Sequence, residues 1–229
     1  MENNEHTIAT ITKSKNRKSL FHFTRVRNLQ AIVQLDALFS SYKINPKSPG
    51  KRREEAQEIN YSEHAITINA HLRIPERMID PSSTLEQFRA CLDRHVFFWP
   101  TLKDCQKMMD TYSRREPDEA FAVLEFDATS LLINHYSAVK LSKYDSGSSP
   151  RFPNNCSYRK SPDMFLPLRS FRTVTNGTVP TKVSEIKEVL IFDQVHNVSQ
   201  YLQAVYVNKC IEIPEQWREL KKLWSDLQV

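Results

Sequence analysis

The stretch FHFTRVRNLQAIVQLDALFSS, residues 21–41, decides the fold that the sequence predicts. Its first residues are typical of a short strand, on which His22 and Thr24 lie two residues apart. An amphipathic helix is expected next, with an apolar stripe made of Val26, Leu29, Ile32 and Val33. Such a helix needs nothing polar on the strand before it, so His22 and Thr24 are candidates for a functional role. The alternative is a capped helix after a strand whose histidine is hydrogen-bonded within the fold.

The size and charge of the chain fit one globular domain. Its 229 residues suit a single domain, or a domain with a long tail. Lysine and arginine number 32 against 27 aspartates and glutamates, which gives a net charge of +5 on a mostly mixed surface. This mild basicity permits a polyanionic partner such as nucleic acid but does not require one.

Composition excludes several classes of site. The three glycines lie too far apart for a Walker loop or a GxGxxG loop, so side chains and non-glycine backbone must hold any dinucleotide. The four cysteines form no CxxC pair, and the histidines show no metal-binding spacing, so we expect reduced thiols and no metal. No apolar run approaches the ~20 residues of a transmembrane helix, and the first residues do not resemble a signal peptide. We therefore expect a cytoplasmic protein that has no membrane segment.

The order of the expected elements indicates an α+β fold. Residues 1–19 are polar, with basic residues near their end, and predict a loosely packed arm. Residues 20–229 predict a single domain that ends in an amphipathic helix beginning at Pro214. Strands are expected at 65–68, 95–100, 121–127 and 187–193, and helices from Ser83 or Thr84, from Thr101 and from Thr129. A helix is also expected over 197–205, with the alternative that AVYV, residues 204–207, already begins a final strand. Because no regular βαβ alternation appears, α+β is favoured over a doubly wound α/β sheet.

Glu188 is the candidate catalytic carboxylate. It lies in EIKEVLIF, where alternation puts it on one face of a strand with Ile186 and Leu190. A carboxylate among apolar side chains is costly unless it is paired or used. The alternative is a strand end that water reaches, and Glu185 is the weaker candidate for the same role. The long polar loop 142–163 precedes this strand, and loops of that length inside a domain are often functional.

Both ends of the domain resemble the DarT-like ADP-ribosyltransferases. The order aromatic-His-aromatic-Thr, Asn-Leu, Ile, Leu-x-Ser in residues 21–41 resembles their opening, and KEVLIFDQVHNVSQYLQAVYV resembles their ending. The resemblance implies an ADP-ribosyltransferase-like split β-sheet with peripheral short helices, and NAD as a substrate. It also implies that His22 and Thr24 orient the nicotinamide end and that Glu188 acts at the reacting ribose.

The same resemblance implies an arginine that holds the phosphates of NAD. By order along the chain both Arg73 and Arg77 qualify, and Arg73 is the residue we expect. The segment HVFFWP is expected to supply a wall of the site, with Phe98 or Trp99 stacking on a ring of the ligand.

A second resemblance covers nearly the whole chain. Its segments FHFTRVRNLQAI, EHAITI, AHLRIPERM, HVFFWPT, LLINHYSAVKLSKYDSGS, RKSPDMFLPLRSF and IKEVLIF follow the order of a bacterial family of uncharacterised domains. Lys160 departs from that pattern, which has glycine after the arginine.

The function that these observations favour is NAD-dependent ADP-ribosyl transfer. By analogy with the DarT-like group, the enzyme would be toxin-like, with nucleic acid as the acceptor and a neutralising partner protein. Two alternatives stay open. One is a catalytically inactive module of the same fold that binds a nucleotide or a partner, and the other is an NAD glycohydrolase, which uses water as the acceptor.

Overall fold

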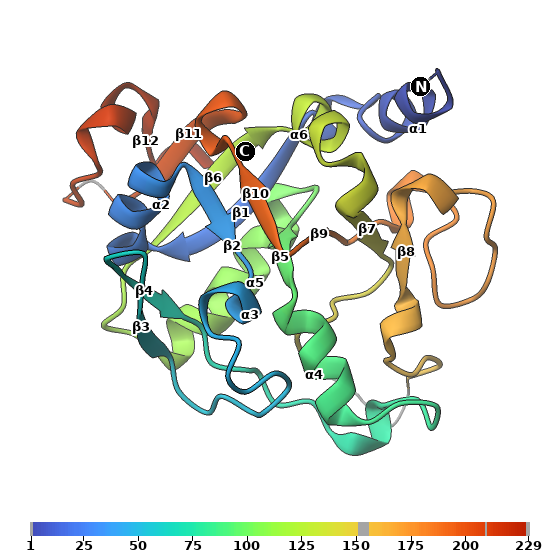
Figure 1. Ribbon diagram of the computed structural model, residues 1–229. Coiled ribbons are helices and arrows are strands. Elements are labelled where there is room, and N and C mark those ends of the chain that lie inside the picture. Colours follow the sequence, from blue (N-terminus) through green and yellow to red (C-terminus); the bar gives the residue numbers. More distant parts are fainter. Residues whose placement is uncertain (1, 151–155, 209, 228–229) are drawn as a thin grey trace.

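The computed structural model describes residues 2–150, 156–208 and 210–227, and within them the strands form two larger and two smaller sheets (Figure 1). The first four-stranded sheet, in spatial order, contains β1 (Ser19–Arg25), β6 (Phe121–Asp127), β11 (Leu202–Val207) and β12 (Lys221–Leu223). The second contains β5 (His95–Phe98), β9 (Glu188–Phe192), β7 (Val139–Ser142) and β8 (Phe165–Pro167). The two-stranded sheets pair β10 (Gln194–His196) with β2 (Ala37–Phe39), and β3 (Gln57–Tyr61) with β4 (His64–Ile68).

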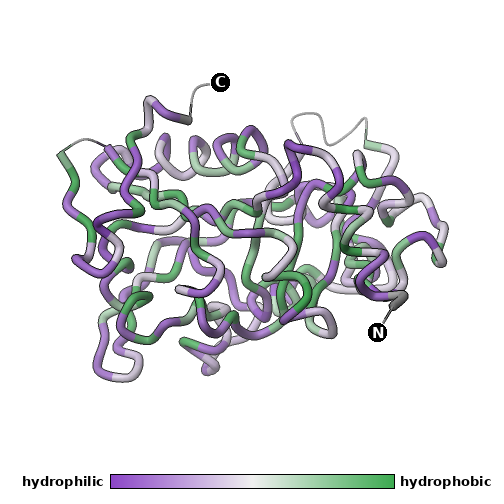
Figure 2. The backbone as a smooth tube through the Cα atoms, turned by 90° about the horizontal axis from the view of Figure 1, so that it is seen from above, coloured by the Kyte–Doolittle hydropathy of each residue, from purple (hydrophilic) through white to green (hydrophobic). Residues whose placement is uncertain are grey.

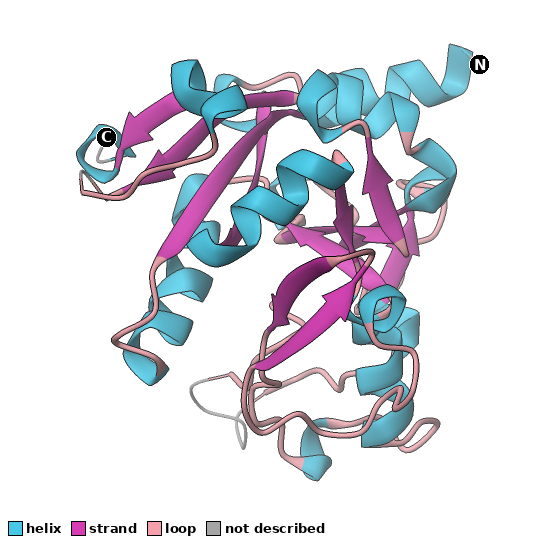
Figure 3. Ribbon diagram, turned by 60° about the vertical axis from the view of Figure 1, so that its left-hand side comes forward, coloured by secondary structure: helices cyan, strands magenta, loops and turns pink. Residues whose placement is uncertain are grey.

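Short helices surround these strands (Figure 3). The α-helices are α1 (Glu2–Ile11), α2 (Leu29–Leu35), α3 (Ser41–Ile44), α4 (Leu85–Asp93), α5 (Leu102–Arg115) and α6 (Ala128–Asn134). Turns of 3₁₀ helix occur at Lys15–Arg17, Val26–Asn28, Glu76–Met78, Tyr136–Ala138, Pro162–Met164, Leu168–Ser170, Val183–Glu185, Val198–Gln200, Glu215–Leu220 and Trp224–Leu227. The chain is therefore of the α+β class. Apolar and polar stretches alternate along it (Figure 2), and no helix in the described ranges combines the length and apolar character needed to cross a membrane.

The two four-stranded sheets meet where β1 passes β5. Phe21 and Trp99 exchange backbone hydrogen bonds in both directions, at 2.9 and 2.8 Å. In the second sheet, Phe98 on β5 pairs with Val189 on the antiparallel strand β9. The residue after Phe98, Trp99, therefore lies opposite the residue before Val189, Glu188. His22 follows Phe21, so the junction brings His22 and Glu188 together from different sheets.

One face of each large sheet packs into the main core. Leu20 and Leu124 come from the first sheet, and Phe98, Val189 and Ile191 come from the second. Side chains alternate between the two faces of a strand, so Phe97 and Trp99 point to the other side of β5 from Phe98. On that other side, Phe97 and Trp99 line a cleft.

The predicted strands at 65–68, 95–100, 121–127 and 187–193 are confirmed as β4, β5, β6 and β9. Two helix starts are also confirmed by their caps. The hydroxyl of Thr84 accepts a hydrogen bond from the N–H of Gln87 in a capping box, and the hydroxyl of Thr101 accepts one from the N–H of Asp104. These local signals fix where α4 and α5 begin.

The N-terminal segment corrects the expectation of a loosely packed arm over residues 1–19. Its first part is helix α1, and Ile8 and Ile11 are 1% and 3% exposed in the main core. The hydroxyl of Thr129 on α6 donates to that of Thr12, and the Arg17 guanidinium donates to the Ile186 carbonyl at 3.4 Å. The two isoleucines are three positions apart, so they share one helix face despite the polar composition around them.

The C-terminal region corrects two predicted helices and confirms the alternative of a final strand at AVYV, residues 204–207. The segment 197–205 contains one 3₁₀ turn, Val198–Gln200, and then strand β11. Its β-branched and aromatic residues suit a strand, nearly all of which is buried here, and β11 pairs with both β6 and β12. After Pro214 the chain forms the 3₁₀ helix Glu215–Leu220, strand β12 and a final 3₁₀ helix instead of an amphipathic α-helix.

Candidate functional site

A cleft of about 230 Å³ lies at the junction of the two large sheets. His22, Thr24, Trp99 and Glu188 line it, and all four are among the six residues that the sequence predicted for the site. Alternation along β1 places His22 and Thr24 on one face, while Glu188 begins β9 on the neighbouring sheet. Strand pairing therefore joins residues that are far apart in the sequence.

His22 is held in one orientation by a backbone carbonyl. Its Nδ1 lies 2.7 Å from the oxygen of Phe97, and because a carbonyl only accepts, Nδ1 carries the proton and donates. Burial lowers the pKa of His22 to about 4, so the imidazole is neutral near pH 7. Its Nε2 is then a bare acceptor, and no group in the described part of the chain uses it.

Thr24 and Trp99 add a hydroxyl and an aromatic wall. Thr24 is 7% exposed, and within residues 2–150, 156–208 and 210–227 its hydroxyl has no hydrogen-bond partner. Trp99 is 6% exposed and contacts the ring of Phe23, with 5.4 Å between ring centroids. This part of the cleft thus offers a free hydroxyl beside a fixed aromatic surface.

Glu188 is a buried carboxyl group with one occupied oxygen. Its side chain is 1% exposed, which contradicts the alternative of a strand end open to water. Oε2 accepts hydrogen bonds from the Ser146 N–H at 3.1 Å and the Ser146 hydroxyl at 2.6 Å, whereas no described residue donates to Oε1. Burial, together with the negative charge of Asp145, raises the pKa of Glu188 to about 8 and outweighs the Ser146 hydrogen bonds.

Glu185 lies outside the cleft and has a structural environment. Its carboxylate accepts from the N–H and hydroxyl of Thr181 at 2.8 and 3.0 Å, and Lys143 lies 3.3 Å away. The hydrogen bonds from Thr181 lower the pKa of Glu185 to about 2. Glu185 therefore ties a loop together, and the cleft contains Glu188 instead.

The structure places Phe98 and Arg73 outside the cleft. Phe98 is completely buried in the main core, on the opposite face of β5 from Trp99. Its ring contacts the ring of His22, with 5.5 Å between the ring centroids. Arg73 is exposed, whereas Leu72 and Ile74 on either side of it are buried. Successive side chains point in opposite directions here, so that of Arg73 points to solvent. Arg77, the other arginine considered, is also exposed.

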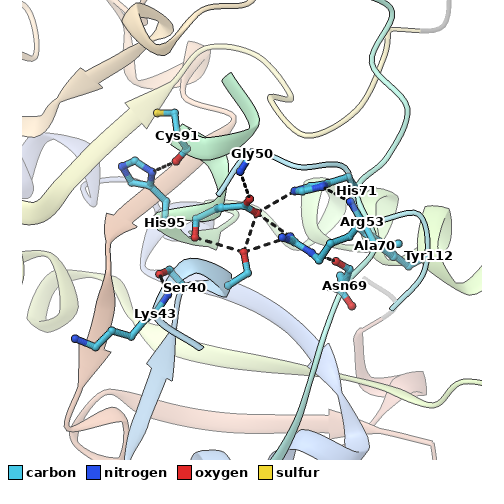
Figure 4. A network of polar contacts seen from close by, with 12 residues as sticks. Ser40, Lys43, Gly50, Arg53, Asn69, Ala70, His71, Cys91, His95 and Tyr112 are labelled. Atoms are coloured by element: carbon cyan, nitrogen blue, oxygen red, sulfur yellow. Dashed lines mark hydrogen bonds and ion pairs between the residues drawn. The ribbon is translucent and has the colours of Figure 1, made fainter. Parts of the chain in front are cut away.

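Sequence reasoning missed a polar network that forms another wall of the cleft (Figure 4). Asp93 at the end of α4 accepts from the Arg53 guanidinium at 2.7 Å, from His71 Nε2 at 2.9 Å and from the Ser41 hydroxyl at 2.9 Å. The backbone N–H of Gly50 also donates to it, at 3.3 Å. These bonds fasten the loop between β2 and β3 to α4.

Arg53 is the cation that this network brings to the cleft. Its Nε donates to the carbonyl of Asn69 at 3.1 Å and its Nη2 to Asp93, while Nη1 has no partner in the described ranges. Burial opposes ionisation of Asp93, yet the hydrogen bonds from His71 and Arg53 hold the pKa of its carboxyl well below the ordinary value. The only signal of Arg53 in the sequence is the basic run KRR, residues 51–53.

A comparison with family models identifies the domain that carries this cleft. Residues 18–202 match a family of unknown function, DUF7002, and this match spans most of the chain. The chain belongs to the DUF7002 family. No curated protein matches the sequence.

The DUF7002 match includes both sides of the cleft. It begins just before β1, which carries His22, and ends at the start of β11, beyond the strand of Glu188. Membership of a family of uncharacterised domains is therefore confirmed, while the resemblance to the DarT-like enzymes stays a hypothesis. The helix α1 and the two last 3₁₀ helices lie outside the match.

The side chains that line this DUF7002 cleft combine polar, aromatic and charged groups. In the described ranges, no group of three or more histidine, cysteine, aspartate or glutamate residues is placed to hold a metal ion. The cleft offers a carboxyl oxygen, an imidazole nitrogen and a hydroxyl, each without a partner in the described part of the chain, beside apolar walls and one arginine. Such a surface suits a ligand that combines flat rings with hydroxyl and phosphate groups.

Proposed function

We propose that this protein catalyses NAD-dependent ADP-ribosyl transfer, with Glu188 as the catalytic residue. One observation carries the proposal. A buried glutamate keeps one carboxyl oxygen free of donors from the described residues, in the same cleft as the fixed imidazole of His22. Burying a carboxyl group this way opposes its ionisation and costs free energy, which makes a role for it in the chemistry a reasonable inference.

In the proposed reaction Glu188 stabilises the ribose as its bond to nicotinamide breaks. The electron pair of that bond leaves with neutral nicotinamide, and positive charge builds on the ribose. The Glu188 carboxylate accepts a hydrogen bond from a ribose hydroxyl and so favours this cation. A new bond then forms between the ribose carbon and a nucleophilic atom of the acceptor, whose proton passes to the carboxylate or to water.

The other cleft residues would bind and orient NAD. The bare Nε2 of His22 can accept a hydrogen bond from a hydroxyl or amide, and Thr24 adds a second hydroxyl partner. Trp99 offers a wall for a flat ring. In place of Arg73, which is exposed, Arg53 lies in the cleft with Nη1 available for a phosphate.

The fold gives the proposal further support. Two four-stranded sheets that join at the bridge between Phe21 and Trp99 are compatible with the split sheet expected from the DarT-like resemblance. The net charge of +5 fits a nucleic-acid acceptor, as in the DarT-like group, although charge alone does not distinguish nucleic acid from another anionic acceptor. A toxin-like role with a neutralising partner protein belongs to the same hypothesis.

The test is to incubate the purified chain with NAD labelled in the adenylate part, together with separate pools of DNA, RNA and protein. ADP-ribosyl transfer predicts free nicotinamide and label attached to one pool. Free ADP-ribose without labelled macromolecule identifies a glycohydrolase instead. NAD binding without turnover, or no binding, identifies a non-catalytic module and contradicts the proposal.

A further inference from the structure

The loop that holds Glu188 is folded around a buried lysine. Lys160 is 0% exposed, and its Nζ donates to the backbone oxygens of Asp145 at 2.6 Å, Ser146 at 2.9 Å and Ser148 at 2.7 Å. An ammonium group has three N–H donors, so these three carbonyls use all of them. The conformation of residues 145–148 therefore depends on the position of one ammonium group.

The backbone of Lys160 is fixed as firmly as its side chain. Its N–H donates to the carbonyl of Met78 at 2.7 Å, and its own carbonyl accepts from the N–H of Asp80 at 2.9 Å. These bonds join Lys160 to the segment that precedes α4. The lysine thus connects that segment with the loop that follows β7.

We propose that Lys160 is a positioning residue for Glu188. By holding the carbonyls of residues 145–148, it sets Ser146 so that both the N–H and the hydroxyl of that serine reach Oε2 of Glu188. Oε1 then receives no bond from the described residues and can accept one from a ligand that enters the cleft. The inference deepens the proposed function and rests on it for its catalytic meaning, but the contact between Lys160, Ser146 and Glu188 is testable without any activity.

Charge adds to this positioning effect. The charged groups that act on Glu188 are Asp145, which raises its pKa, and Lys160, which lowers it. Among the other titratable groups that line the cleft, burial lowers the pKa of His22 and of His95 to about 4, so both are neutral near pH 7, while Arg53 and Asp93 pair with each other. Removing the lysine takes away a positive charge and loosens the Ser146 donors. Both effects disfavour the carboxylate, so both raise the pKa of Glu188.

The experiment compares Lys160→Met with the native chain by carbon-13 NMR of the glutamate carboxyl carbons across pH, with Glu188→Gln assigning the resonance. Lys160→Met should move the titration midpoint of Glu188 upward by about one unit. Lys143→Met is the matched control, because Lys143 pairs with Glu185 beside the same loop, and it should leave the midpoint in place. In an active protein, Lys160→Met should also lower kcat near pH 7 about tenfold and leave KM for NAD unchanged.

An unmoved Glu188 midpoint in Lys160→Met would overturn the proposal, because a lysine that only supports the fold lowers the melting temperature without this shift. If Lys160→Met does not fold, Ser146→Ala replaces it, since it removes the 2.6 Å hydroxyl bond and should also raise the midpoint. No midpoint change in Ser146→Ala counts against the inference. A shifted midpoint in a chain that never cleaves NAD keeps the positioning role and removes the proposed function instead.

Discussion

Ser146 gives both of its donors to one oxygen of Glu188, its N–H at 3.1 Å and its hydroxyl at 2.6 Å. The carboxyl group is thus held by the protein through Oε2, while Oε1 receives no bond from the described residues. Two donors on one oxygen fix the plane of the carboxyl group and stabilise its charged form. This one-sided arrangement leads to two expectations about Glu188.

Glu188→Gln should reduce NAD turnover by about a hundredfold or more. The amide keeps the size of the side chain but cannot stabilise positive charge on the ribose, and a lost charge of this kind is worth a few kcal/mol in the transition state. Affinity for NAD should change much less, because the effect belongs to the transition state. Nicotinamide release, measured at about pH 9 to keep the native carboxyl ionised, checks this.

Glu185→Gln is the internal control. Glu185 binds Thr181 and Lys143 outside the cleft, so its loss should affect turnover only mildly. Full activity in Glu188→Gln combined with inactivity in Glu185→Gln would show that the catalytic carboxylate is assigned to the wrong residue.

The pH dependence of activity and stability should both follow the Glu188 carboxyl, whose pKa burial raises to about 8. Activity should rise with pH up to about that value, because the ionised form is the active one. The contribution of Glu188 to the unfolding free energy should instead fall as pH rises. The folded protein binds this proton more tightly than the unfolded chain, so the contribution of Glu188 is greatest below its ordinary pKa of 4.5 and is lost as pH rises toward 8.

Urea titrations of the native chain and Glu188→Gln at several pH values separate these effects. The fall in unfolding free energy between about pH 5 and 8 should be smaller in the glutamine variant, which has no proton to lose. Equal slopes in the two proteins would show that Glu188 titrates near its ordinary value.

Local patterns were enough to predict β5, β6, β9 and the caps of α4 and α5. Each depends on neighbouring residues, as when Thr84 and Gln87 cap a helix within one turn. The same reasoning placed His22 and Glu188 correctly on their strands. Their meeting at one cleft depends on the bridge between Phe21 and Trp99, a long-range contact that no local pattern contains.

The sequence-based predictions that were wrong or missing also depend on long-range contacts. The expected arm forms a helix because Ile8 and Ile11 find a core supplied by distant segments. No local pattern indicates a role for Arg53, because only the fold brings Asp93 and Asn69 to it. The sequence shows Lys160 only as a departure from a family pattern and does not predict its burial. Its three carbonyl partners are brought to it by the tertiary structure.

Arg53→Met should weaken NAD binding about tenfold, and Arg73→Met should leave it unchanged. The reason is location, since Arg53 lines the cleft and a charge-assisted bond to phosphate is worth roughly 1.5–3 kcal/mol. The measurement is the rise in melting temperature that saturating NAD produces in each variant, relative to the same variant without NAD. Arg52→Met, which removes an exposed neighbour paired with Glu54, is the matched control. A loss of NAD response in Arg73→Met but not in Arg53→Met would restore Arg73 as the phosphate ligand.

Asp93→Asn should lower the unfolding free energy at pH 7 by about 3 kcal/mol, because it leaves the mostly buried guanidinium of Arg53 without its counter-charge. Hydrogen bonds hold the pKa of Asp93 below its ordinary value, so its stabilising effect is present above that value. The effect is lost as pH falls through the lower pKa of the folded state.

Urea titrations at pH 7 and about pH 3 should therefore show a smaller difference in unfolding free energy between the variant and the native chain in acid. Glu54→Gln, at an exposed ion pair, should change little at either pH. An Asp93→Asn variant as stable as the native chain at pH 7 would mean that the network in Figure 4 does not hold this wall of the cleft in place.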